Sequence, residues 1–135
     1  MTDSATLGQV LRDSKRLAIV GLSADDARPS NVVARYMQAR GYTVIPVNPK
    51  CAQILGEKCY PNLKAIPGPV DLVDVFRKSG DCLSIAADAV AIGAKVLWLQ
   101  QGVINEEARE LAAAAGLTVV MDRCLKIEFA RLFSG

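Results

Sequence analysis

The chain contains five short stretches of mostly apolar residues, and segments with helical patterns separate most of them. The stretches cover residues 17–22, 43–47, 70–76, 96–99 and 117–121. Their apolar residues follow one another directly, which is typical of strands buried on both faces of a parallel sheet. Strands that alternate with helices place those helices on the two faces of such a sheet. The sequence therefore predicts a Rossmann-like, doubly wound α/β fold, with a mainly parallel sheet of about five strands in a single domain over residues 1–135.

Helical spacing appears on both sides of the first apolar stretch. Leu7, Val10 and Leu11 share one face of a helix expected within residues 1–16. A second helix is expected to begin near Ser30 and to end at Gly41, because glycine is common just after helix C-termini. The first strand is thus expected to lie between two helices along the chain.

Other residues mark where later elements begin or end. Ser79, Asn105 and Asp122 are expected to cap helices that end near residues 92, 115 and 133, because such side chains accept hydrogen bonds from helix N–H groups. Pro46 has no N–H group and is expected to end or disrupt the second strand.

Composition and charge exclude several classes of function. The formal net charge is +2, which is too weak to indicate a nucleic-acid partner. No apolar run approaches the roughly 20 residues of a membrane span, and the first residues do not resemble a secretory signal. The chain has no histidine, and its four cysteines form no Cys-x-x-Cys pair, so a structural zinc site is not expected. These features favour a cytoplasmic protein with free thiols, bound to neither nucleic acid nor membrane.

The first strand and the following helix predict an anion-binding site. Gly21 ends the strand, and a polar loop leads to the helix that begins near Ser30. Unpaired N–H groups and the positive end of the helix dipole meet in such a loop and favour phosphate groups.

Ligands of open α/β sheets bind beyond the carboxyl ends of the strands, so we collect the residues that follow each strand. They are Gly21, Leu22 and Ser23; Asn48, Pro49 and Lys50; Phe76, Arg77 and Lys78; Gln100 and Gln101; and Asp122, Arg123 and Cys124. Three loops supply cations, namely Arg28 or Arg35, Lys50, and Arg77 with Lys78. That arrangement suits a ligand with several phosphates, although each cation taken singly is equally consistent with a solvated surface residue.

Two common nucleotide ligands do not fit these loops. The dinucleotide pattern Gly-x-Gly-x-x-Gly keeps only Gly21 here, and Asn48 follows the second strand where NAD sites carry an acidic residue. No Gly-Lys-Ser/Thr sequence is present, so the usual phosphate-binding loop of ATP-hydrolysing proteins is absent.

An ordered set of motifs resembles a known family. The motifs are Gly21-Leu22-Ser23, Arg28-Pro29-Ser30, Val44-Ile45-Pro46-Val47-Asn48-Pro49, Val73-Asp74-Val75-Phe76-Arg77, Trp98-Leu99-Gln100 and Met121-Asp122-Arg123-Cys124. Together they resemble the stand-alone CoA-binding domain family, whose fold is that of the N-terminal domain of the succinyl-CoA synthetase α-subunit. The resemblance extends from about residue 12 to residue 132. It implies a protein that binds CoA or an acyl-CoA.

The resemblance also implies roles for individual residues. Gly21, Leu22, Ser23 and Ala24 would face the CoA diphosphate; Arg28 and Ser30 would add phosphate contacts; Asn48, Pro49 and Lys50 would flank the adenosine and its 3′-phosphate; and Val75, Phe76 and Arg77 would contact the adenine or the start of the pantetheine arm. Ligation is not implied, because this chain lacks the histidine on which the synthetase carries its phosphoryl group.

Two functions from different classes remain open at this stage. The first is a non-catalytic CoA-binding module that acts as a carrier, sensor or subunit, with no catalytic residue and with a homo-oligomer or protein partner left open. The second is a small enzyme acting on CoA or a related nucleotide, with Cys124 or one of Asp71 and Asp74 as the working group. The positive end of the closing helix and Arg123 would favour the reactive thiolate of Cys124, whereas simple packing is the alternative.

Overall fold

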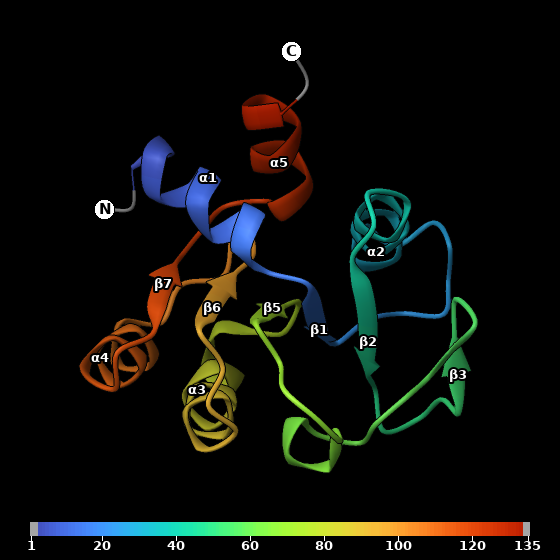
Figure 1. The fold of residues 1–135 in the computed structure, drawn as a ribbon. Helices are drawn as coiled ribbons and strands as arrows, with labels where there is room; N and C mark the ends of the chain where they lie inside the picture. The colour runs from blue at the N-terminus through green and yellow to red at the C-terminus, as the bar shows by residue number, and fades with distance from the viewer. Residues whose placement is uncertain (1–2, 134–135) are drawn as a thin grey trace.

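A central sheet of five parallel strands organises the computed structural model, which describes residues 3–133 (Figure 1). Across the sheet, the strands are β2 (Thr43–Val47), β1 (Arg16–Val20), β5 (Leu72–Val75), β6 (Val96–Leu99) and β7 (Thr118–Val120). All neighbouring strands in this sheet pair in parallel. The predicted doubly wound, Rossmann-like fold is confirmed.

Helices cover both faces of this sheet. They are α1 (Ser4–Asp13), α2 (Pro29–Ala39), α3 (Cys82–Ala91), α4 (Glu106–Ala114) and α5 (Leu125–Phe133), with short 3₁₀ turns η1 (Leu63–Ala65) and η2 (Ser79–Asp81). Figure 1 shows α1, α2 and α5 on one side of the sheet and α3 and α4 on the other. A small antiparallel pair, β3 (Gln53–Ile54) and β4 (Glu57–Lys58), follows β2.

The core consists of two apolar layers, because successive strand residues point to opposite faces of the sheet. Leu17 and Ile19 of β1 join the layer beneath α1, α2 and α5, while Ala18 and Val20 join the layer beneath α3 and α4. Both faces of the central strands are therefore buried, which explains their continuous apolar sequence.

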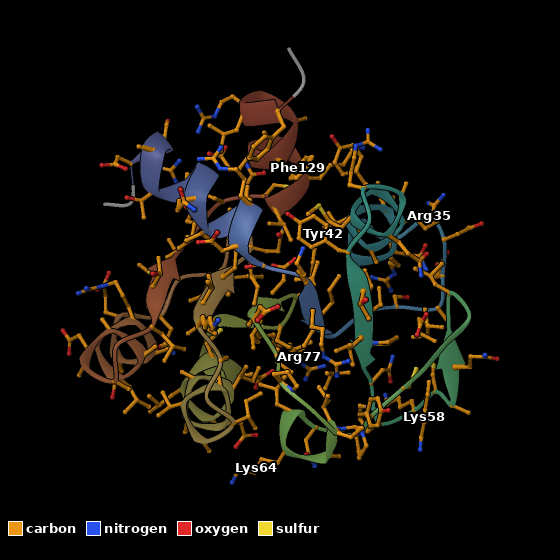
Figure 2. All side chains as sticks on the ribbon, in the orientation of Figure 1. Arg35, Tyr42, Lys58, Lys64, Arg77 and Phe129 are labelled. Carbon is orange, nitrogen blue, oxygen red and sulfur yellow. The ribbon has the colours of Figure 1, made fainter. Side chains whose placement is uncertain are left out.

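Aromatic side chains fill the first of these layers. Trp98 of β6 is fully buried and donates its indole N–H to the backbone oxygen of Arg123 at 2.8 Å. Tyr42 and Phe129 lie near each other on the side of α1 and α5 (Figure 2), with ring centroids 6.0 Å apart in an edge-to-face arrangement. Trp98 thereby holds the segment just before α5, and Tyr42, which directly precedes β2, packs against α5 itself.

One of the three expected helix caps is confirmed, and two are wrong. The side chain of Asn105 accepts the N–H of Ala108 and begins α4 as expected. Ser79 instead lies in η2, and its hydroxyl accepts the N–H of Ile104. Asp122 has a positive φ of 61° and accepts the N–H of Gly102. Both side chains bind loops that the fold brings near, which local sequence does not reveal.

Pro46 lies one residue before the end of β2, so the expected strand end is confirmed, but it does not disrupt the strand. β2 is the edge strand of the five-stranded sheet, and the Pro46 carbonyl faces outward to accept the N–H of Tyr60 at 3.0 Å. The nitrogen of Pro46 faces the same outer side, so the pairing of β2 with β1 loses no hydrogen bond. Register therefore continues through Pro46, which pairs with Ile19.

Candidate functional site

The order of the strands reverses between β1 and β5. The chain leaves β1 through α2 to form β2 on one side, then returns to form β5 on the other side of β1. The connections that leave these two strands diverge to opposite faces of the sheet. Such a point is where open α/β sheets bind their ligands, beyond the carboxyl ends of the strands.

The loop after β1 begins at this switch point. Gly21 adopts a positive φ of 86° and donates its N–H to the Val47 oxygen of β2. The backbone N–H of Ser23 donates to the Ser30 hydroxyl at 3.0 Å. The backbone N–H of Asp25 donates to the Ser23 hydroxyl, also at 3.0 Å. Several N–H groups of the loop are thus bonded within it, so its shape is set before any ligand binds.

Side chains from neighbouring elements hold the same loop. Asn48, which follows β2, donates to the Leu22 oxygen at 2.9 Å, and Asn31 of α2 donates to the Ser23 oxygen at 2.9 Å. Arg35 donates to the Asp26 oxygen at 2.8 Å. Of the two arginines that the sequence offered for this loop, Arg35 therefore supports its backbone, whereas Arg28 is left at the surface.

A hollow of about 610 Å³ opens beside the loop, on the face covered by α3. We call it the α3-side hollow. It is lined by Val20, Gly21, Ser23, Arg28, Val47, Asn48, Pro49, Lys50, Pro61, Asn62, Leu63, Arg77, Asp81, Ser84, Ile85 and Asp88. The fold thus brings Ser23, Lys50 and Arg77, which belong to three separate loops, to a single cavity.

Cations from three loops share this hollow. Arg77 Nη2 lies 3.1 Å from Asp81 Oδ2, and Arg28 Nε lies 4.0 Å from Asp25 Oδ2. Lys50 forms no ion pair with any residue between 3 and 133. Exposed pairs of this kind contribute little free energy, so all three cations remain available to an anionic ligand.

The wall of the α3-side hollow that faces these cations is partly apolar. Leu63 of η1 and Ile85 of α3 present apolar surface. Ser84 and Asp88, also on α3, add a hydroxyl and a carboxylate that is 3.6 Å from Lys64. A flat heterocycle with exocyclic polar groups suits such a wall better than a second phosphate does.

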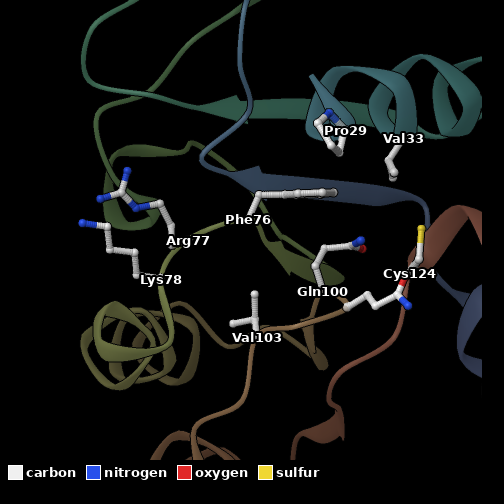
Figure 3. Close-up of a pocket in the computed structure, with 9 residues that line it drawn as sticks. Pro29, Val33, Phe76, Arg77, Lys78, Gln100, Val103 and Cys124 are labelled. Carbon is white, nitrogen blue, oxygen red and sulfur yellow. The ribbon is translucent and has the colours of Figure 1, made fainter. Parts of the chain in front are cut away.

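A second hollow, of about 580 Å³, lies toward α2 and the start of α5. We call it the α5-side hollow. It is lined by Pro29, Val33, Phe76, Arg77, Lys78, Gln100, Gln101, Val103 and Cys124 (Figure 3). Arg77 lines both hollows, so the two cavities meet at the residue that follows Phe76 beyond β5.

Gln100 places a hydrogen-bond donor in the α5-side hollow. Its side-chain oxygen accepts the N–H of Leu125, the first residue of α5, at 3.0 Å. Because the oxygen of a side-chain amide accepts hydrogen bonds and its nitrogen does not, this bond fixes which way the Gln100 amide is turned. Gln100 is only 6% exposed, and its amide nitrogen, which has no acceptor within residues 3–133, keeps access to the hollow and to solvent. Figure 3 shows the amide between Phe76 and Cys124.

Comparisons with known proteins connect this geometry to a family. The sequence model of the CoA binding domain matches residues 15–130. The chain belongs to this CoA-binding family. YneT of Bacillus subtilis (strain 168) is 44% identical to this CoA-binding domain over 126 residues, covering 93% of each chain. A solved structure from Pyrococcus horikoshii OT3 is 38% identical, with a TM-score of 0.94 over 97% of this chain and 92% of its own.

A larger enzyme contains a related segment. The ADP-forming acetate–CoA ligase I of Archaeoglobus fulgidus is 27% identical to this CoA-binding domain over 121 residues. The match covers 82% of this chain and only 18% of the ligase. The shared segment is therefore a small part of that enzyme.

Some residues that the sequence singled out lie away from both hollows. Leu22 and Val75 are fully buried in the core, Ser30 is 5% exposed beneath the loop it supports, and Ala24 is exposed but lines neither hollow. Sequence reasoning missed the wall formed by Leu63, Ser84, Ile85 and Asp88. The helix expected after the third strand could have indicated Ser84, Ile85 and Asp88, because it lies beside the carboxyl end of that strand. No local pattern in the sequence indicated Leu63.

The two aspartates of the enzyme hypothesis differ in environment. Partial burial of Asp71 opposes its ionisation, but hydrogen bonds from the N–H groups of Arg16 and Lys15 outweigh that effect and lower its pKa. Asp74 is fully buried in β5, and neither carboxylate oxygen has a hydrogen-bond partner within the described residues. Burial raises the pKa of Asp74 well above its usual range. Neither residue lines either hollow.

In residues 3–133, no helix is both long and apolar enough to cross a membrane. Within the same residues, no group of three or more His, Cys, Asp or Glu is placed to hold a metal ion.

Proposed function

We propose that this domain binds CoA or an acyl-CoA across the switch point between β1 and β5. The observation that carries the proposal is that two hollows, one toward α3 and one toward α5, share Arg77 in their linings. CoA has two chemically different halves, a phosphorylated adenosine and a pantetheine arm, joined by a diphosphate. The charge and polarity of each hollow suit one of these halves.

The adenosine half fits the α3-side hollow. Lys50 and Arg28 would bind its 3′-phosphate and the outer part of the diphosphate, because charge-assisted hydrogen bonds favour phosphate oxygens. The adenine ring would contact Leu63 and Ile85, and its amino group or the ribose hydroxyls would reach Ser84 and Asp88.

The pantetheine half fits the α5-side hollow. Arg77 lines both cavities and would bind the diphosphate between them. Phe76 and Val103 provide apolar contacts for the methyl and methylene groups of the arm, and the unpaired amide nitrogen of Gln100 would donate to one of its carbonyls.

We further propose that the domain acts as a carrier, sensor or subunit for CoA and not as a self-sufficient ligase. The chain has no histidine to carry a phosphoryl group. The carboxylates of Asp71 and Asp74 line neither hollow. A cytoplasmic location agrees with four free cysteines, since reducing conditions keep thiols free.

Isothermal titration calorimetry with CoA, dephospho-CoA, NAD and ATP tests the proposal. We expect CoA to bind most tightly and dephospho-CoA more weakly. Thermal unfolding gives an independent measure, because ligand at about a hundredfold over Kd stabilises by roughly 2.7 kcal/mol. Binding of NAD or ATP without binding of CoA would overturn the proposal.

Arg77→Ala tests the position of the ligand. We expect it to weaken CoA binding, whereas Lys95→Ala removes the same charge at the opposite, amino-terminal edge of the sheet and should leave binding unchanged. Equal effects of the two variants would show that net charge, and not this site, attracts CoA.

A further inference from the structure

The α5-side hollow contains a thiol. Cys124 lines it, is partly exposed, and directly precedes α5. Figure 3 shows Cys124 at the end of the hollow opposite Arg77 and Lys78, with Phe76 and Gln100 between them. A ligand arm that enters at Arg77 and runs along Phe76 would therefore end near this sulfur.

Gln100 independently offers a hydrogen-bond donor to a ligand in the space before Cys124. The residue is 6% exposed and lines the hollow, and its amide nitrogen has no acceptor in the described residues. Because this nitrogen is not fully buried, water in the hollow can accept its hydrogen bond in the free chain, and an acceptor on a ligand can replace that water. A carbonyl of an amide-containing arm would be such an acceptor, and the apolar surface of Phe76 and Val33 would contact the rest of that arm.

The other cysteines differ from Cys124. Cys59 and Cys82 are buried, and burial raises the pKa of each thiol. Cys51 is partly exposed but lines neither hollow. Thiol–disulfide exchange requires an accessible thiol. Cys124 is the cysteine that is both partly exposed and placed in a hollow.

We propose that Cys124 undergoes thiol–disulfide exchange with disulfides of CoA; the proposal rests on the proposed binding of CoA by this domain. The Cys124 thiolate attacks the CoA sulfur of a disulfide between CoA and a second thiol. A bond forms between the Cys124 and CoA sulfurs, the original S–S bond breaks, and the second thiol leaves as a thiolate. The leaving thiolate takes up the proton that Cys124 lost, so the CoA disulfide is the only oxidant required.

The same exchange runs in reverse when free thiols are abundant. A small thiol attacks the mixed disulfide and releases CoA together with the reduced Cys124. The domain would thus hold CoA covalently under oxidising conditions and reversibly under reducing conditions. The polar contacts at Arg77 and Gln100 would be the same in both states.

Intact-protein mass spectrometry of the reduced chain tests the exchange. Incubation with CoA disulfide should add one CoA moiety, peptide mapping should place it on Cys124, and dithiothreitol should remove it. Cys124→Ser should lose the adduct, whereas the matched variant Cys51→Ser should keep it. An adduct on another cysteine, or none on Cys124, would overturn the proposal.

Two comparisons separate directed exchange from a merely reactive thiol. Oxidised glutathione lacks the phosphorylated adenosine, so it should not gain from the binding site. We expect its reaction with Cys124 to be slower than that of CoA disulfide by roughly a factor of ten or more, because binding raises the effective concentration of a reactant. Arg77→Ala should slow only the reaction with CoA disulfide. Equal rates with both disulfides would contradict a role for the binding site.

Calorimetry with reduced CoA distinguishes failure of this inference from failure of the proposed function. If reduced CoA binds both the original chain and Cys124→Ser but no adduct forms on Cys124, the exchange is wrong and the binding proposal stands. If reduced CoA binds neither chain, both proposals fail.

Discussion

Gly21 and Phe76 approach each other so closely that no larger residue fits at position 21. A Cβ placed on Gly21 would lie 2.5 Å from the Phe76 carbonyl oxygen and 3.0 Å from Arg77 Cδ. The chain just after β1 and the chain just after β5 therefore lie against each other, beside the side chain that the two hollows share. A side chain at position 21 would press on Arg77, which lines both cavities.

Gly21→Ala should destabilise the fold and weaken CoA binding. Its positive φ alone costs an alanine about 1–2 kcal/mol, and the contact with the Phe76 backbone adds to that. Gly41→Ala is the matched control, because Gly41 has a φ of 96° but nothing within 4 Å of the added Cβ. Urea denaturation should show a larger loss for Gly21→Ala; equal losses would mean that the close contact costs nothing.

Lys50→Ala should weaken binding of CoA more than binding of dephospho-CoA. Lys50 lines the α3-side hollow without an ion-pair partner in the described residues, so its charge is free for the 3′-phosphate. One charge-assisted hydrogen bond contributes about 1.5–3 kcal/mol, or roughly tenfold or more in Kd. Calorimetry with both ligands measures the difference, and an equal loss for the two would remove this assignment.

Gln100→Glu should weaken binding of CoA while preserving α5. The glutamate keeps an oxygen for the N–H of Leu125 but loses the donor that faces the α5-side hollow. Gln101→Glu introduces the same charge at a neighbouring, exposed position of that hollow and serves as the control. Calorimetry should show the larger loss for Gln100→Glu, with unchanged helical circular dichroism in both. A larger loss for Gln101→Glu would contradict the assigned donor.

The buried carboxyl of Asp74 should make stability fall as the pH rises. Its pKa is raised in the folded chain, so above the unfolded value of about 3.9 the folded state binds more protons than the unfolded state. The contribution of Asp74 to the free energy of unfolding is greatest below that value. It decreases as the pH rises from there to the raised pKa, by at most about 1.4 kcal/mol per pH unit. Urea denaturation at a series of pH values above the unfolded value of about 3.9 should show this fall in stability, and Asp74→Asn should reduce it.

Asp71→Asn is the matched control for Asp74, because the pKa of Asp71 is shifted the other way. Hydrogen bonds from Arg16 and Lys15 lower it despite partial burial, so Asp71 stabilises the fold above its unfolded pKa and loses that effect as the pH falls. Asp71→Asn should therefore lower stability at neutral pH and leave the slope due to Asp74 in place. Parallel pH profiles for the original chain and Asp74→Asn would contradict the assignment to Asp74.

Local sequence was sufficient for much of the fold. The range 43–47 of the second strand and the range 96–99 of the fourth match β2 and β6, because their apolar runs are short and bounded by polar or glycine residues. Asn105 was identified as a cap because its partner, Ala108, lies within the same turn. Ser79 and Asp122 were misassigned because each accepts an N–H from a residue at least 20 positions away.

The sequence by itself determined the succession of strands and helices, and with it the edge of the sheet where the cations of three loops emerge. That information is local, since burial on two faces and helical spacing are properties of short segments. Only the tertiary structure decided that Arg28 and not Arg35 faces the cavity, that Leu63 and Ile85 form its opposite wall, and that Arg77 joins it to the hollow of Gln100 and Cys124. These relationships depend on strand order and on contacts between segments far apart in the chain, and no short stretch of residues specifies them.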